Sequence, residues 1–168
     1  MARRKRAELS LRNEKSLPIV EFYNRRGEMT CFYTMKFRHG PDAARTDTAE
    51  RVKALIEERG VVVWEEPFNV ACKQGDYLVV RAEGRTLCLL KVLSSEEEVF
   101  ECGDDFADFY WANHAKHVRV LSWYDEDQER FQLPTFDWRG WVQRCQEVQA
   151  SKRQEQLQNW LQKCGERQ

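Results

Sequence analysis

Short apolar and aromatic runs of strand length, some of them in alternation with polar residues, recur between Leu17 and Pro134. This alternation is typical of strands that bury one face, because successive side chains of a strand point to opposite sides. LPIVEFY and EMTCFYTMKF flank NRRG, so we predict a hairpin over residues 17–37 with its turn closed at Gly27. Further strands are predicted at VVVW, at FNVAC and within GDYLVVRAEGRTLCLLKVLSS, where residues 82–85 form a turn.

The last predicted strand is HVRVLSWY, which begins at His117. Strict alternation predicts two faces, one with Val118, Val120 and Ser122 and the other with Arg119, Leu121 and Trp123.

A helix is predicted at about 47–59, within DTAERVKALIEERG. Asp47 and Glu50 form a capping box, and Gly60 is a typical stop. The apolar face has helical spacing and consists of Ala49, Val52, Leu55 and Ile56.

A second helix is predicted over residues 141–168, which contain no proline. Its apolar positions form two groups with spacings of three and four, namely Trp141, Val142, Cys145 and Val148, then Leu157, Trp160, Leu161 and Cys164. We expect the first group to pack on the domain. Leu157, Trp160 and Leu161 either dock there as well or form an exposed stripe that binds a helical partner protein.

Many short strands around one helix are typical of a small, strongly bent sheet or β-barrel. We therefore predict a mainly β protein with helices, of the α+β class, with a single barrel-like domain over residues 17–140. Residues 1–16 contain too little apolar surface to repay ordering and are predicted to be a flexible basic arm. The arm serves for nuclear import or phosphate binding, or is an ordinary solvated terminus; its basic core is Arg3, Arg4, Lys5 and Arg6.

The 168 residues carry a formal net charge of −1, so no overall basic field draws the protein to nucleic acid. The six cysteines form no C-x-x-C pair, and His114 and His117 have no third ligand at a matching spacing, so we predict no metal and no cofactor. No catalytic constellation is visible, and we expect no enzymatic activity. The chain has neither a signal-peptide core nor a run of about 20 apolar residues, which predicts an intracellular protein without membrane contact. A nuclear location is predicted from the basic core of the arm, a candidate nuclear-import signal.

Seven acidic residues occur between Ser94 and Tyr110 with no Lys or Arg among them. Such a run is either a solvated loop or a docking face for a basic peptide. The residues assigned to this acidic docking face are Glu97, Glu98, Asp104, Asp105 and Asp108. The last three also match a D-D-x-x-D magnesium motif of isoprenoid synthases, but this strand-rich chain is too short for the all-helical cavity of those enzymes.

The pentapeptide WYDED places two aromatic rings beside three acids. Ring faces attract a quaternary ammonium ion, and nearby carboxylates add long-range attraction, so this composition predicts a methyl-lysine cage. A small core does not easily bury this many large rings, so we expect some to line a groove; an ordinary core position is the alternative for each of them. The proposed peptide site consists of Trp64, Tyr110, Trp111, Trp123, Tyr124, Asp125 and Glu126.

Three segments resemble the bromo-adjacent homology domain, a chromatin module. They are GDYLVV from Gly75, LCLLKV from Leu87, and VRVLSWYDE from Val118. The resemblance implies a β-rich barrel that binds methylated lysines of histone tails, with Trp123, Tyr124 and Glu126 on the strand and turn that build the cage.

The same strands also resemble PUA-like and EVE-like domains, through the Gly-Asp strand and a late strand from His114 or His117 to Trp123. That resemblance implies a reader of modified bases, in which Trp64, Trp111 and Trp123 stack a flipped base and the basic arm holds phosphates. The acidic run opposes this second function, because it repels the nucleic-acid backbone.

The function predicted from the sequence is therefore non-catalytic recognition of a basic peptide, such as a histone tail with a methylated lysine. A base reader and a structural subunit that uses its C-terminal helix are the two alternatives.

Overall fold

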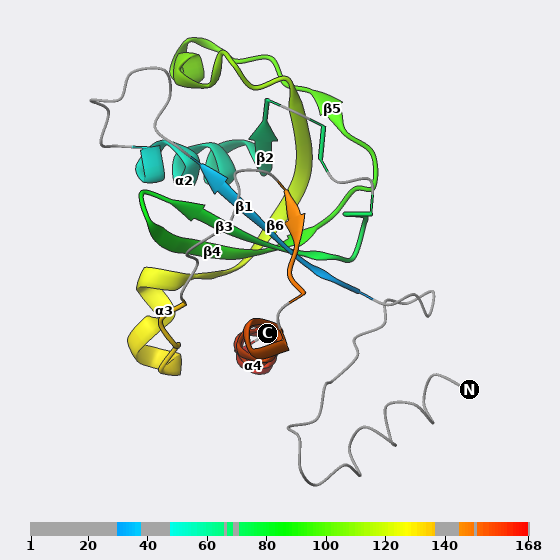
Figure 1. Cartoon of the computed structure of the whole chain (residues 1–168). Coiled ribbons are helices and arrows are strands. Elements are labelled where there is room, and N and C mark those ends of the chain that lie inside the picture. The colour runs from blue at the N-terminus through cyan, green and yellow to red at the C-terminus, as the bar shows by residue number, and fades with distance from the viewer. Residues whose placement is uncertain are drawn as a thin grey trace, which may run out of the picture.

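The computed structural model describes residues 30–37, 48–65, 67–68, 71–136, 145–149 and 151–167. They form a mixed α+β fold around a curled sheet (Figure 1). The strands are β1 (Phe32–Phe37), β2 (Val61–Trp64), β3 (Tyr77–Ala82), β4 (Arg85–Val92), β5 (Glu98–Val99), β6 (His114–Trp123) and β7 (Gln146–Glu147). The helices are α2 (Thr48–Arg59), the 3-10 helix η1 (Asp104–Phe109), α3 (Tyr124–Phe131) and α4 (Ser151–Arg167).

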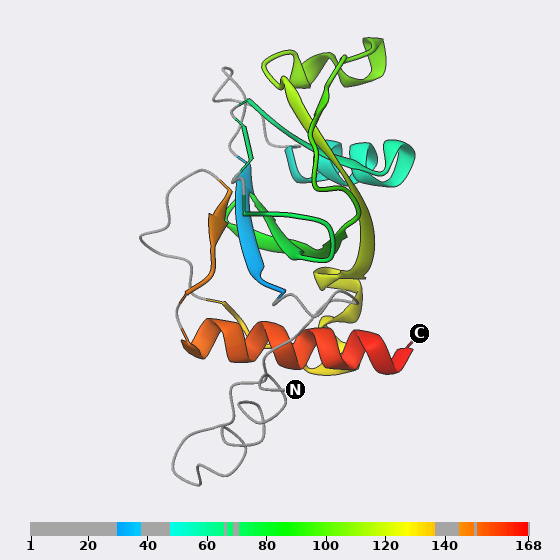
Figure 2. The same cartoon turned by 90° about the vertical axis from the view of Figure 1, so that its right-hand side faces the viewer.

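The pairing of the strands curls the sheet into a half-barrel. The strand order is β2-β6-β4-β3-β1-β7, and β5 also pairs with β6. Only the β1–β3 pair is parallel among the described strand pairs. The first half of β6 pairs with β2 and β5 and its second half with β4, so this strand bends around the sheet (Figure 2). The strongly bent sheet predicted from the sequence is confirmed.

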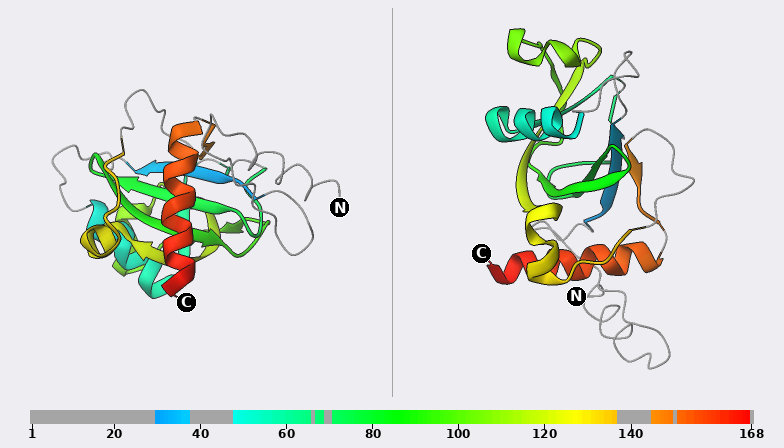
Figure 3. Two further views of the ribbon diagram at one scale, coloured as in Figure 1. Left: turned by 90° about the horizontal axis from the view of Figure 1, so that it is seen from below. Right: turned by 90° about the vertical axis from the view of Figure 1, so that its left-hand side faces the viewer.

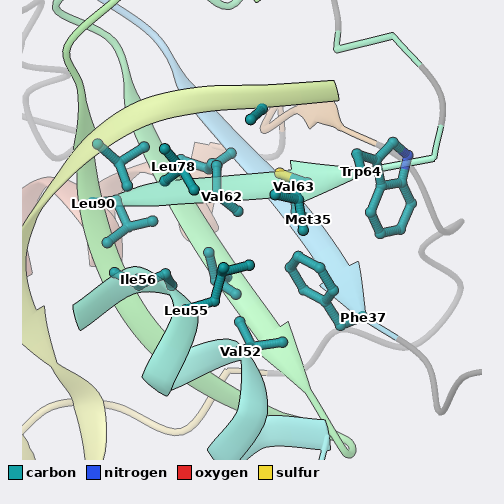
Figure 4. Packing of buried hydrophobic residues seen from close by; sticks show 14 of the residues in the cluster. Met35, Phe37, Val52, Leu55, Ile56, Val62, Val63, Trp64, Leu78 and Leu90 are labelled. Carbon is teal, nitrogen blue, oxygen red and sulfur yellow. The ribbon is translucent and has the colours of Figure 1, made fainter. Parts of the chain in front are cut away.

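Helix α2 fills the concave side of the sheet and confirms the helix predicted at about 47–59. Its residues Val52, Leu55 and Ile56 pack against the strands (Figure 4). At its start, the backbone N–H of Ala49 donates to Glu83 Oε1 at 3.1 Å. Asp47, the predicted cap, lies outside the described residues.

Helices α3 and α4 cover the opposite side of the sheet, and α4 crosses the strands (Figure 3). The predicted C-terminal helix exists but begins at Ser151. The expected start at 141 is wrong, because Gln146 and Glu147 pair with β1 as a strand. Hydrogen bonding to that sheet edge fixes the extended backbone here, against the helical spacing of the apolar residues.

The apolar stripe on α4 is not exposed. Leu157, Trp160 and Cys164 are each at most 1% exposed, and Leu161 is half-buried against the same cluster. The apolar face of α4 therefore packs against its own sheet. Of the two alternatives predicted, docking on the domain is correct and an exposed stripe is wrong.

A β-bulge overturns the predicted faces of β6. The register against β4 shifts so that Leu89 pairs with Ser122, while Leu90 pairs with Val120. The extra residue, Leu121, puts Ser122 on the α4 side and returns Trp123 to the α2 side. Strict alternation had assigned both residues to the opposite faces.

Several predictions lie outside the described residues, namely the first strand of the 17–37 hairpin, the basic arm at 1–16 and the boundary at 140. Within the part of the chain that the structure describes, no helix is both long enough and apolar enough to cross a membrane.

Candidate functional site

Four aromatic rings meet where β1 and β2 end and the chain enters β6. We call Phe37, Trp64, Phe109 and Trp111 the Trp64–Trp111 cluster. The ring centres of Trp64 and Trp111 are 6.2 Å apart, with their planes at 88°. Phe37 meets Trp64 edge to face at 5.4 Å, and Phe109 lies 5.9 Å from Trp111. The two indole rings are therefore adjacent and perpendicular to each other.

Backbone hydrogen bonds fix the segments that carry the two indole rings. Trp64 is the last residue of β2 and pairs with His114, the first residue of β6. The Asn113 N–H donates to the Trp64 carbonyl at 3.0 Å, and the Ala112 N–H donates to the Phe109 carbonyl at 2.7 Å. The loop that carries Trp111 is thus tied at both ends to the sheet and to η1.

The indole N–H of Trp64 is buried and has no hydrogen-bond partner among the described residues. The residue is 5% exposed, whereas Trp111 is half-buried. In Figure 4 the Trp64 nitrogen lies on the side of the ring away from Phe37 and Met35. A buried donor without an acceptor costs about 1–3 kcal/mol. A ligand atom that accepts a hydrogen bond from this N–H would remove that cost.

The acidic run is only partly free for docking. Glu97 binds the His114 imidazole at 3.0 Å and accepts from the Phe68 N–H at 2.6 Å, so its carboxylate joins β6 to the loop after β2. Glu98 pairs with His117 at 2.9 Å. These two residues therefore serve the fold as well as the surface.

The other acids of the run lie around η1. Asp104 and Asp105 are exposed and line an open groove of about 460 Å³ together with Arg51 and Glu58 of α2. Arg51 donates to the Asp105 carbonyl, which ties the groove walls together. The side chain of Asp108 is not among those described. No group of three or more potential metal ligands occurs among the described residues.

Trp123 and Tyr124 point to opposite sides of the sheet. Tyr124 is 8% exposed, and its ring lies 5.5 Å from Trp160 and 6.0 Å from Phe136. Its hydroxyl donates to the Pro134 carbonyl. Burial, and then the charge of Asp125, raises the pKa of the phenol. Tyr124 is a core residue, so the prediction that both rings share an accessible rim is wrong.

Trp123 instead faces a hollow of about 180 Å³ beside α2. The Lys53 ammonium lies 4.8 Å from the centre of its ring and 2.9 Å from Glu126 Oε1. On the same side, Arg85 binds Asp125 at 2.6 Å. Trp123, Asp125 and Glu126 thus lie together, as the sequence predicted. Their cationic partners, Lys53 and Arg85, belong to the same chain.

The predicted tryptophan set is divided between two places. Trp64 pairs with the first residue of β6 and Trp123 is its last, and a strand of this length spans about 30 Å when extended. Trp64, Trp111 and Trp123 therefore do not form one base-stacking site. Tyr110, which is 63% exposed, follows η1 and stands next to Trp111 in the chain.

Sequence reasoning did not assign Lys53 or Arg85 to a site, and it named Asp127 among the three acids of WYDED without predicting that it is buried. Ser122 Oγ donates to Asp127 Oδ2 at 2.7 Å and accepts from the Trp160 indole at 2.9 Å. The one local signal for the buried Asp127 was its position four residues after Trp123, in the first turn of α3. The pairing of Lys53 and Arg85 with distant acids has no local signal.

No family model and no curated protein match the chain. Among solved structures it is similar to the YTH domain of the Zygosaccharomyces rouxii MRB1 protein, whose crystal structure is a complex with N6-methyladenosine RNA. The TM-score is 0.45 and the identity 14%, and the match covers 84% of this chain and 91% of that chain. The comparisons place the chain in neither of the two families that its sequence resembles.

Proposed function

We propose that the protein is a non-catalytic reader that takes one base of a nucleic-acid strand into the Trp64–Trp111 cluster. The observation that carries this proposal is the buried Trp64 N–H, which has no partner among the described residues and lies beside the half-buried Trp111 ring. A base supplies both of the missing parts, a flat ring to stack on Trp111 and an acceptor atom for the Trp64 donor.

The right angle between the two indoles favours a flat ligand with a polar edge. A base that stacks on Trp111 lies perpendicular to the ring plane of Trp64, and the acceptor atoms on its edge are then the groups that pair with the Trp64 N–H. A methylated ammonium group gains from the ring faces but has no acceptor for the N–H, whose positive end opposes a cation. For this cluster, a base is therefore a better ligand than a methyl-lysine.

The surrounding charge limits how the strand is held. Glu101, Asp104 and Asp105 are exposed near the cluster and repel phosphates. In this proposal the Trp64–Trp111 cluster therefore supplies most of the affinity, and the phosphates of the strand lie away from η1. Contacts of the basic arm at Arg3–Arg6 with phosphates, and its use in nuclear import, stay predictions from the sequence.

Binding of single-stranded oligonucleotides to the full chain tests this function. The probes are two oligonucleotides of one sequence, one unmodified and one with a methylated base, followed by fluorescence anisotropy. Trp111→Ala should weaken binding at least about tenfold, because stacking of one base contributes about 1–3 kcal/mol.

Trp123→Ala is the matched control, because it removes a half-buried tryptophan at the other end of β6. It should leave oligonucleotide binding within about twofold of the wild type. Equal losses in both variants, or no binding of either oligonucleotide by the wild type, would contradict the proposal.

A basic peptide on the acidic docking face is the second candidate function. It is favoured by the exposure of two large apolar side chains beside the acids, Val99 at 82% and Tyr110 at 63%. Of the acids assigned to this face, Glu98, Asp104 and Asp105 have exposed side chains. A histone-peptide array with wild type and Tyr110→Ala separates this function from base reading, since only peptide docking predicts that the array signal depends on Tyr110.

A further inference from the structure

The hollow beside Trp123 lies between α2, the start of β4 and the first turn of α3. The half-buried Trp123 ring forms one wall, and the polar walls are Glu50, Lys53, Arg85, Asp125 and Glu126. Trp123 reaches this side only because the bulge at Leu121 shifts the register of β6. The hollow is thus a product of the fold, at the opposite end of β6 from the Trp64–Trp111 cluster.

The ammonium group of Lys53 already lies in this hollow, over the Trp123 ring. Its Nζ is 4.8 Å from the centre of the Trp123 ring, 2.9 Å from Glu126 Oε1 and 4.0 Å from Glu57 Oε1. A ring face with carboxylates around it is what an ammonium group needs for binding. The geometry of an ammonium site is therefore complete, with its occupant supplied by α2.

The charge around the hollow favours cations over anions. Its lining has three acids, Glu50, Asp125 and Glu126, against Lys53 and Arg85. Asp125 and Glu126 lie in the first turn of α3, where negative side chains interact favourably with the helix dipole. If Lys53 leaves, Trp123 and Glu126 face the hollow with no cation of their own, while Arg85 stays with Asp125 at 2.6 Å.

We infer that this hollow is a binding site for a lysine side chain of a basic peptide, and that Lys53 occupies it in cis until the peptide lysine displaces it. The Lys53 side chain is 35% exposed, so it can turn into solvent without opening the core. The exchange replaces one ammonium with another, which makes binding weak in the wild type and stronger when Lys53 is absent. This site is independent of the proposed base pocket.

A titration of the full chain with N-acetyl-lysine amide, followed by NMR of the Trp123 indole N–H, tests the inference. Lys53→Met is one atom shorter, keeps the unbranched shape of the side chain and removes its charge. We expect it to bind the probe about three- to fivefold more tightly than the wild type, in line with the contribution of a cation over an exposed tryptophan. Lys53→Gln should behave in the same way and guards against a packing effect of methionine.

Two controls make the outcome decisive. N-acetyl-norleucine amide has a similar chain without the ammonium and should not shift the Trp123 signal, and Trp123→Leu in the Lys53→Met background should abolish lysine binding. Equal affinity in wild type and Lys53→Met, or equal binding of both probes, would overturn the inference. The Trp64 indole signal should stay still throughout, so this result is read separately from base binding.

Discussion

Asp76 is a buried carboxylate that links two parts of the sheet. It is 1% exposed; its Oδ1 accepts from the Cys31 N–H at 3.0 Å, and its Oδ2 accepts from the Lys73 N–H at 2.8 Å. Burial raises its pKa above the ordinary value of 3.8, although the two backbone donors act in the other direction. Each oxygen therefore has its own donor, and the ionised form still costs free energy.

This raised pKa makes a prediction about pH. Because the folded pKa of Asp76 lies above the unfolded one, its contribution to the free energy of unfolding rises as pH falls through the folded pKa. It levels off below the unfolded pKa. An NMR titration of the Asp76 carboxyl carbon should give a midpoint above 3.8. A midpoint below that value would mean that the two backbone donors outweigh burial.

At the scale of elements, α4 is a structural part of the domain. Trp160 is 1% exposed, stacks edge to face on Tyr124 at 5.5 Å, and donates to Ser122. Trp160→Ala should lower the free energy of unfolding by about 3–5 kcal/mol, measured by urea denaturation, because it leaves a large cavity and removes the indole N–H that donates to Ser122 Oγ. Gln162→Ala, at an exposed position of the same helix, should change it by less than about 0.5 kcal/mol. Equal small effects would restore the partner-binding interpretation of α4.

The elements that the sequence predicted best are those with local signals. Helix α2 has its apolar spacing and its stop, Gly60 with a φ of 64°, within one short segment. The bulge at Leu121 and the strand β7 were missed, because each arises from pairing with a distant strand. Local helical spacing therefore misplaced the start of α4, and strict alternation misplaced Trp123.

The sequence predicted which residues belong to candidate sites, but not which of them lie together. Trp64, Trp111, Trp123, Asp125 and Glu126 were all named from the sequence, yet the fold divides them between the two ends of β6. Their separation follows from the long bent strand. The partners that decide what each site can bind, such as Lys53 on Trp123, come from helices far away in the sequence.

At the scale of the whole molecule, the curled sheet carries two aromatic sites with different chemistry. The Trp64–Trp111 end has two perpendicular rings and the buried N–H of Trp64, whereas the Trp123 end offers a ring face among carboxylates. We propose a base as the ligand of the first and an ammonium group as the ligand of the second. Such an arrangement would let one small domain contact a nucleic-acid strand and a basic protein segment at opposite ends of one strand.

The most direct test is the indole N–H resonance of Trp64, assigned with Trp64→Phe and followed by NMR as a base-methylated oligonucleotide is added. The account predicts that the signal begins at the position of an N–H without a hydrogen bond and moves downfield as the base supplies an acceptor. A Trp64 signal that is already hydrogen-bonded in the free protein, or one that does not move while the oligonucleotide binds, would contradict it.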